Sequence, residues 1–334
     1  MVASASTGAM FPRARARAGM YESFYLRAVS PEEPVGVWIR HTVQKPPGER
    51  ARGSVWCTVF DAARGAPFMH KLTSERLLVP DGGWIEVGDA GGQGGAFGPD
   101  GMRGACGPAD WALGFEALEP ELRHLPREWL YRAPLPRTKL TSPAPSATFS
   151  GRLRVESRAE MELAGWRGMV GHNWGAEHAE RWIWLHGVGF EGAPDAWIDV
   201  ALGRILLAGR LTPWLANGAF SLDGQRLRLG GLGAGGLQVR EGPDGCTLRL
   251  PGEDGVVVHV RASVPAGTAA GWRYADPDGG SEHDVVNCSI AGLELDLERR
   301  GAGPPRSLRS AHGGAYELGM RERDHGVPIA PFGD

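Results

Sequence analysis

The densest group of chemically reactive side chains lies in residues 171–187, which read GHNWGAEHAERWIWLHG. These residues include three His, two Glu, one Arg, one Asn and three Trp. Carboxyl and imidazole groups donate and accept protons, and the faces of indole rings attract positive charge. This composition suits proton transfer to a ligand that is held against aromatic rings.

The second half of this stretch has the period of a β-strand. If residues 181–190 are extended, Trp182, Trp184 and His186 share one face, and Ile183 and Leu185 share the other. Such a face is either the packed interior of a barrel or the wall of a pocket. The preceding HNWGAEH adds polar groups, and each of them would need its own hydrogen-bond partner in a packed core. We therefore expect a strand end and turn there, with Gly171 and Gly175 interrupting the regular strand.

Two alternatives exist for the polar segment 172–178. In a purely structural role, His172 and Asn173 would bond to loop backbone, and Glu177 would pair with Arg181 four residues later. A metal site would draw its ligands from His172, Glu177, His178 and His186. Their spacing matches no compact metal motif, so we expect no metal.

The rest of the chain is dominated by short segments that alternate polar and apolar residues. They are separated by turn-forming Gly, Pro and Asp clusters, and they include residues 35–43, 54–62, 147–163, 196–209, 255–264 and 284–299. Helical periodicity is scarce, with 121–130 as the main candidate, interrupted by Pro126. The pattern predicts an all-β protein of two barrel or sandwich domains.

A weak internal similarity supports this division, because each half contains a Trp-rich strand followed by a second Trp-bearing strand. We expect a disordered leader at 1–19, an N-terminal β-domain at 20–168, a C-terminal β-domain at 169–323 and a tail at 324–334. In the first domain, YESFYLR places Tyr21 and Tyr25 on one face, whereas Arg40 and His41 point in opposite directions from their strand. These four residues either line a pocket or lie on solvated strand faces.

Composition narrows the function classes. A formal charge of -3 and a pI of about 6.4 do not favour a nucleic-acid partner and leave a small neutral or anionic ligand. Four widely separated cysteines, at 57, 106, 246 and 288, indicate isolated thiols. Neither a membrane span nor a signal peptide is recognisable, so the sequence predicts a cytoplasmic protein. It does not predict an oligomeric state.

The HNWG motif before a Trp-rich strand resembles the carotenoid 1,2-hydratase (hydroxyneurosporene synthase) and tocopherol cyclase superfamily. YESFYLRA (21–28), WIDVALGR (197–204) and YADPDG (274–279) are similar to bacterial relatives of that group, and the resemblance spans residues 20–323. It implies two lipocalin-like β-barrels in tandem. It also implies a long apolar isoprenoid substrate, protonation of an alkene, and no metal or organic cofactor.

With that chemistry, the resemblance implies a role for each candidate. Glu177 or Asp199 would be the acid, because burial raises the pKa of a carboxyl group, and the relay would be His178, His172 or His186. The indoles of Trp174, Trp182, Trp184 and Trp197 would stabilise the cation. Substrate contacts would come from these rings together with Asn173, Tyr21, Tyr25, Arg40 and His41.

Two other functions fit the same fold. Lipocalin-like barrels also carry apolar ligands without catalysis, and a shaped cavity can promote pericyclic cyclisation or isomerisation. An enzyme of the hydratase or cyclase type needs a buried carboxyl group beside the Trp wall, whereas a carrier needs only the apolar cavity.

Overall fold

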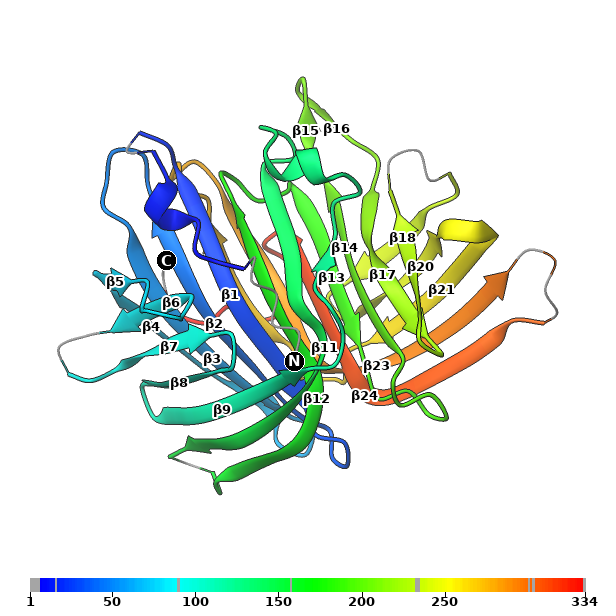
Figure 1. Ribbon diagram of the computed structural model, residues 1–334, viewed down its shortest axis with the longest axis horizontal. Helices are drawn as coiled ribbons and strands as arrows, with labels where there is room; N and C mark the ends of the chain where they lie inside the picture. Colours follow the sequence, from blue (N-terminus) through cyan, green and yellow to red (C-terminus); the bar gives the residue numbers. More distant parts are fainter. Residues whose placement is uncertain are drawn as a thin grey trace.

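The computed structural model describes residues 7–15, 17–88, 91–156, 158–231, 235–299, 301 and 304–332. Within these ranges the strands form two large antiparallel sheets, which lie side by side, and one separate hairpin (Figure 1). This confirms the predicted all-β fold with two lipocalin-like domains in tandem. No helix in the described ranges is long and apolar enough to cross a membrane.

The first sheet curves around its own core in the order β4-β3-β2-β1-β12-β11-β9-β8-β7-β6-β5, and β10 pairs with β11. Its strands are β1 (Met20–Val29), β2 (Val35–Lys45), β3 (Arg52–Asp61), β4 (Gly65–Ser74), β5 (Arg76–Leu78), β6 (Ile85–Gly88), β7 (Gly94–Gly98), β8 (Gly101–Cys106), β9 (Ala109–Ala117), β10 (Leu122–Arg123), β11 (Thr138–Val155) and β12 (Met161–Gly175).

The second sheet has the order β18-β17-β14-β13-β24-β23-β21-β20-β19, and β22 pairs with β23. Its strands are β13 (Arg181–Gly187), β14 (Trp197–Arg204), β17 (Leu215–Leu222), β18 (Gln225–Gly230), β19 (Gln238–Gly242), β20 (Gly245–Pro251), β21 (Val256–Ser263), β22 (Ala270–Ala275), β23 (Glu282–Arg299) and β24 (Arg306–Met320). The separate hairpin is β15 (Leu206–Leu207) with β16 (Arg210–Leu211).

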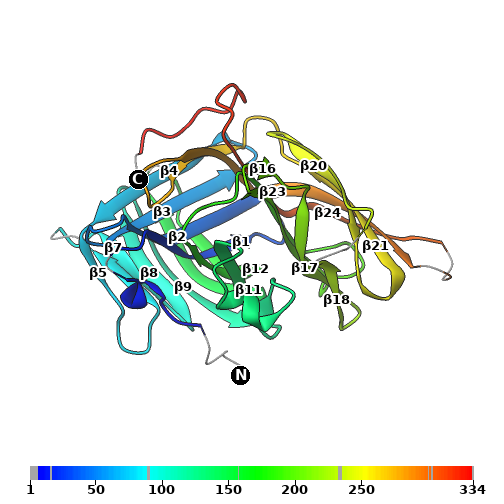
Figure 2. The same ribbon diagram turned by 90° about the horizontal axis from the view of Figure 1, so that it is seen from above.

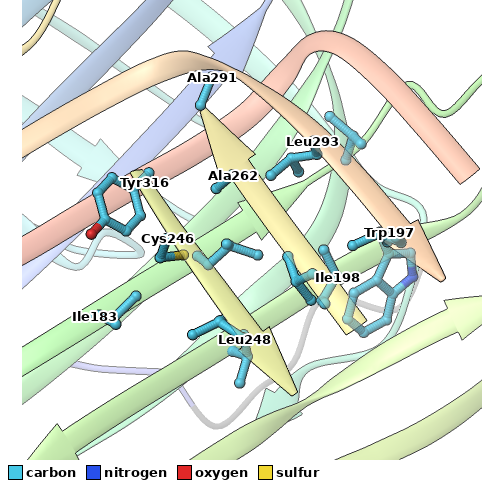
Figure 3. Close-up of a cluster of buried hydrophobic side chains, with 14 of the residues drawn as sticks. Ile183, Trp197, Ile198, Cys246, Leu248, Ala262, Ala291, Leu293 and Tyr316 are labelled. Carbon is cyan, nitrogen blue, oxygen red and sulfur yellow. The ribbon is translucent and has the colours of Figure 1, made fainter. Parts of the chain in front are cut away.

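Each sheet has an apolar core, and the second core also includes Trp38, Trp56 and Phe60 from the first sheet. In the second domain, Ile183, Ile198, Leu248 and Leu293 belong to one buried cluster together with Trp197 (Figure 3). All four cysteines are buried and free, as their isolated spacing predicts.

β1 separates the first core from the second domain. Phe24 and Leu26 pack into the first core, whereas Tyr25 points away from it and contacts Trp184 of the second sheet. The fully buried Arg27 crosses the same boundary, donating to the carbonyl oxygens of Ser289 (2.8 Å) and Gly313 (3.0 Å). The period-two alternation thus gives one strand an apolar face and a face toward the other domain.

The chain passes from the first sheet to the second at a later residue than we expected from the sequence. The expected boundary between residues 168 and 169 falls inside β12, which pairs with β1 and β11 as far as Gly175. Gly171 does not end the strand. A Cβ atom at this position would lie 2.2 Å from the Tyr25 ring, so glycine lets that ring cover the backbone. The second sheet begins at Arg181.

Both terminal segments contact the domains. Residues 1–6 and 16 of the expected leader lie outside the described residues, but Phe11–Arg13 form the short 3-10 helix η1. The Glu22 carboxylate fixes this helix by accepting the backbone N–H groups of Met10 and Phe11. In the C-terminal tail, Phe332 packs against His70 of β4, which brings this part of the tail beside the first sheet (Figure 2).

The candidate helix at 121–130 is not α-helical. Leu122–Arg123 form β10, and Glu128–Tyr131 form the 3-10 helix η2. Pro126 lies between them and offers no backbone N–H for a continuous helix. A third 3-10 helix, η3, spans Glu253–Gly255.

Candidate active site

A cavity of about 570 Å³ is lined by residues from both sheets and from the segment that connects β10 to β11. This volume lies within the range of small-molecule pockets, about 300–1,000 Å³. Apolar side chains provide most of the lining, and Leu125, Leu130, Leu206 and Leu215 are among them. The cavity suits an apolar ligand.

The aromatic wall comes from strands of both domains. β13 contributes Trp182 and Trp184, and β1 contributes Tyr25, whose ring meets Trp184 edge-on at a centroid distance of 5.5 Å. Trp38 of β2 and Tyr274 of β22 complete the wall. The Arg40 guanidinium lies 4.4 Å from the centroid of the Tyr274 ring, so one cation is already held against this wall.

Asp199 is a fully buried carboxylate beside this wall. Its oxygens accept the hydroxyl of Ser142 (2.5 Å) and the indole N–H of Trp184 (3.1 Å), and His124 Nε2 lies 3.2 Å away. Burial raises the pKa of Asp199, but His124 and Ser142 lower it by more, so the net pKa lies below its usual value. Asp199 is therefore an anion that holds a histidine, rather than the neutral acid expected from burial alone.

His124, the partner of Asp199, lies at the cavity. Its side chain is 2% exposed and belongs to the cavity lining. An imidazole can both donate and accept a proton, and the Asp199 carboxylate lies 3.2 Å from its Nε2. The pair therefore has the groups needed to exchange a proton with a ligand in the cavity.

A second carboxylate, Glu317 of β24, also lines the cavity. It accepts the indole N–H of Trp182 (2.9 Å), the side-chain amide of Asn287 (3.2 Å) and the hydroxyl of Tyr274 (3.4 Å). These bonds fix the orientation of two rings of the aromatic wall.

His178 lines the cavity and is paired with Asp276. One carboxylate oxygen of Asp276 accepts both the His178 Nδ1–H (2.7 Å) and the His178 backbone N–H (2.8 Å). The imidazole stacks on Tyr21 at a centroid distance of 4.1 Å and on Trp182 at 5.4 Å. The Asp276 carboxylate and these two rings together fix the orientation of the His178 side chain.

Glu177 lies at the mouth of the cavity. Its side chain is 36% exposed and forms an ion pair with Arg137, not with Arg181 as the structural alternative supposed. Arg181 instead pairs with Glu241 and Glu322. The Glu177 carboxylate therefore faces solvent and a cation, unlike the buried carboxyl group that we expected beside the Trp wall.

Two of the three candidate histidines lie away from the cavity lining. His172 is on the opposite face of β12, where its Nε2–H donates to Glu22 (2.7 Å) and its ring stacks on Phe24. His186 is buried where the domains meet, with Nδ1 accepting from Arg27 (3.1 Å) and Nε2–H donating to the Pro145 carbonyl (2.9 Å). The alternative metal set therefore does not assemble.

Six of the nine residues expected to contact substrate line the cavity: Asn173, Trp182, Trp184, Tyr21, Tyr25 and Arg40. The other three do not. Trp174 packs on Tyr131 and His172, Trp197 lies in the second core (Figure 3), and His41 points into the first core beside Phe97. A strand pattern assigns a residue to a face without identifying which face borders a cavity.

Three polar residues of the site were missed from the sequence: His124, Asp276 and Glu317. Asp276 belongs to the segment YADPDG, which we had noted for its similarity to a family and whose Asp-Pro pair indicates a turn. His124 and Glu317 stand in unremarkable sequence and reach the site through long-range strand pairing. No local signal identifies them.

Two lipocalin-like β-domains in tandem, with a cavity lined by both, define the class of this protein. No family model matches the chain. An uncharacterised protein found in two strains of Mycobacterium tuberculosis is 26% identical over 298 residues, which is 87% of this chain and 85% of that protein.

Solved structures of similar architecture include CghA with Sch210972 (TM-score 0.59, 12% identity, 91% of this chain and 88% of that one). Another is a putative AttH from Nitrosomonas europaea (TM-score 0.53, 12% identity, 96% and 99%). A third is kievitone hydratase from Nectria haematococca (TM-score 0.51, 10% identity, 91% and 89%). At these identities the likeness establishes a shared fold.

Proposed function

We propose that the protein is a hydratase- or cyclase-type enzyme that acts on an apolar, unsaturated, isoprenoid-like small molecule. The observation that carries this proposal is the His124–Asp199 pair at an aromatic cavity of about 570 Å³. Similarity in fold to kievitone hydratase, and the HNWG motif of the carotenoid hydratase and tocopherol cyclase superfamily, support the same reaction class.

In this mechanism, His124 transfers its proton to one carbon of a substrate double bond, and the adjacent carbon becomes cationic. The faces of Trp182 and Trp184 stabilise that cation by about 0.5–2 kcal/mol each. In a hydratase, water adds to the cation and returns one proton to neutral His124. In a cyclase, an internal hydroxyl or alkene attacks, and the proton that is lost returns to the same imidazole. Asp199 keeps the imidazole oriented throughout.

One observation favours a non-catalytic carrier as the second candidate. Both carboxyl groups that we expected to act as acids already lie beside a basic side chain, Asp199 beside His124 and Glu177 beside Arg137. A carrier would use the same cavity and the same aromatic wall without any proton transfer.

Hydration can be tested with acyclic and cyclic terpenoids in water enriched in oxygen-18. We expect labelled or rearranged product with the wild type, and a fall in kcat of about 100-fold or more in His124→Gln and Asp199→Asn. KM should change little, because neither group provides most of the apolar contact. Asp110→Asn, which removes an exposed carboxylate paired with Arg154, is the matched control.

Ligand binding, followed by quenching of tryptophan fluorescence, separates the two candidates. A wild type that binds terpenoids but yields neither label nor rearranged product is a carrier. A wild type that binds none of them contradicts both proposals.

A further inference from the structure

We propose that His178, Asp276 and His283 form a binding site for a divalent transition-metal ion at the wall of the cavity. One nitrogen of each imidazole and one carboxylate oxygen of Asp276 lie within 4.8 Å of one another. Two imidazoles and one carboxylate are a donor set that suits Zn²⁺ and Fe²⁺. This site differs from the histidine and glutamate set considered in the sequence, where we expected no metal.

The three donors come from separate elements that are fixed relative to one another. His178 lies between β12 and β13, Asp276 directly follows β22, and His283 is on β23, where it pairs with Tyr274. The backbone N–H of Asp276 donates to the carbonyl of Ser281 (2.8 Å), which closes the turn between β22 and β23. The cluster is thus held by backbone bonds before any ion binds.

His283 provides the strongest evidence for a metal ion. Its side chain is fully buried, and neither ring nitrogen has a hydrogen-bond partner. Buried polar atoms are nearly always satisfied, and His283, unlike the equally unpartnered His41, lies within ligand distance of another imidazole and a carboxylate, so an ion there would satisfy it. Its ring centroid lies 6.0 Å from that of His178, and the ligand-atom separations place one of its nitrogens beside Asp276.

The neighbouring positive charges are compensated. Arg321 pairs with Glu180, and Arg323 pairs with Glu282 and Asp284. When an ion binds, it replaces the proton shared by His178 Nδ1 and Asp276. The backbone N–H of His178 still holds that carboxylate in place.

Among the three donors, His178 lines the cavity and the other two do not. An ion would therefore be reached through the cavity, and three protein donors leave coordination positions for water. The ion could hold a water molecule close to the ligand. This inference does not depend on the proposed reaction, because binding is measured without any substrate.

The experiment uses the full chain after removal of metals with a chelator. Zn²⁺ is titrated calorimetrically, and Co²⁺ is followed by its visible absorption. We expect one ion per chain in the wild type and at least a 100-fold weaker affinity in His283→Gln and Asp276→Asn. His259→Gln, which removes a half-exposed histidine paired with Glu298, should bind like the wild type.

X-ray absorption of the zinc-loaded wild type gives a measurement that does not depend on variants that fold poorly. We expect two imidazole nitrogens and at least one oxygen around zinc. The proposal is overturned if the wild type binds neither ion, if folded His283→Gln binds as tightly as the wild type, or if fewer than two imidazoles surround the zinc.

Discussion

Each histidine of the GHNWGAEHAERWIWLHG stretch is placed by a different partner. His172 is hydrogen-bonded to Glu22 of the first domain, and His178 faces the cavity beside Asp276. His186 lies where the domains meet. Residues of one type within 15 positions therefore have three separate environments. The chemistry open to each imidazole differs accordingly.

Acid should destabilise the fold through its buried histidines. Burial lowers the pKa of His41 to about 4, and burial together with Arg27 lowers that of His186 to about 3. An unfolded chain binds protons at these positions below about pH 6.5, whereas the folded protein does not. The unfolding free energy should therefore fall as the pH drops from 6.5 to 4, by about 1.4 kcal/mol per unit for each histidine.

Urea unfolding at a series of pH values checks this expectation. His41→Phe keeps an aromatic ring and removes one titrating group, so its stability should fall less steeply with acid than that of the wild type. Equal slopes for His41→Phe and the wild type would contradict the assignment.

Among the secondary-structure elements, two short irregular ones frame the mouth of the cavity. The β15–β16 hairpin exposes Leu206 (53%) and Leu207 (55%), and η2 exposes Trp129 (62%). Leu206 and Trp129 also belong to the cavity lining. These elements contribute little to either core, so their side chains can contact a ligand without a loss of core packing.

We expect Leu206→Asp to weaken binding of an apolar ligand several-fold. Stability should change by no more than about 0.5 kcal/mol, because the side chain is exposed. Leu118→Asp, which alters another exposed leucine (44%) outside the cavity lining, is the control. Binding by fluorescence and unfolding by urea give the two readouts. If both variants weaken binding equally, the hairpin has no special role at the mouth.

Taken as a whole, the molecule is held together across the domain boundary by polar contacts as well as apolar packing. Arg27 is fully buried there and donates to His186 and to two backbone carbonyls of the second domain. A buried cation with three acceptors is costly to disrupt, because the acceptors lose their donor and remain buried. Arg27 therefore supports docking of the domains together with apolar contacts such as that of Trp56 with Trp272.

Arg27→Met should lower the unfolding free energy by about 3–5 kcal/mol. It should also separate the unfolding transitions of the two domains. Arg154→Met, at an exposed ion pair, should cost less than about 1 kcal/mol. Differential scanning calorimetry resolves the transitions, and one wild-type-like transition in Arg27→Met would rule out this role.

The fold was predictable because strand alternation is local. The segments at 35–43 and 181–190 alternate as β2 and β13 do, and Arg40 and His41 point in opposite directions as expected. The site was less predictable, because its polar groups meet through long-range pairing. Asp199 and His124 are 75 residues apart, and the pKa of Asp199 depends on that encounter.

The alternation of β1 also has a consequence for how new specificities arise. Tyr21 and Tyr25 face the cavity, while Phe24 and Leu26, at positions of the other parity, fill the first core. Mutations at Tyr21 and Tyr25 therefore alter the cavity wall, and mutations at Phe24 and Leu26 test folding. A library that randomises Tyr21 and Tyr25 and keeps Arg27 would diversify the cavity wall and leave the barrel interior and the domain contact untouched. Because the cavity-facing and core-facing positions are different residues, the cavity wall can change by single substitutions without altering the first core.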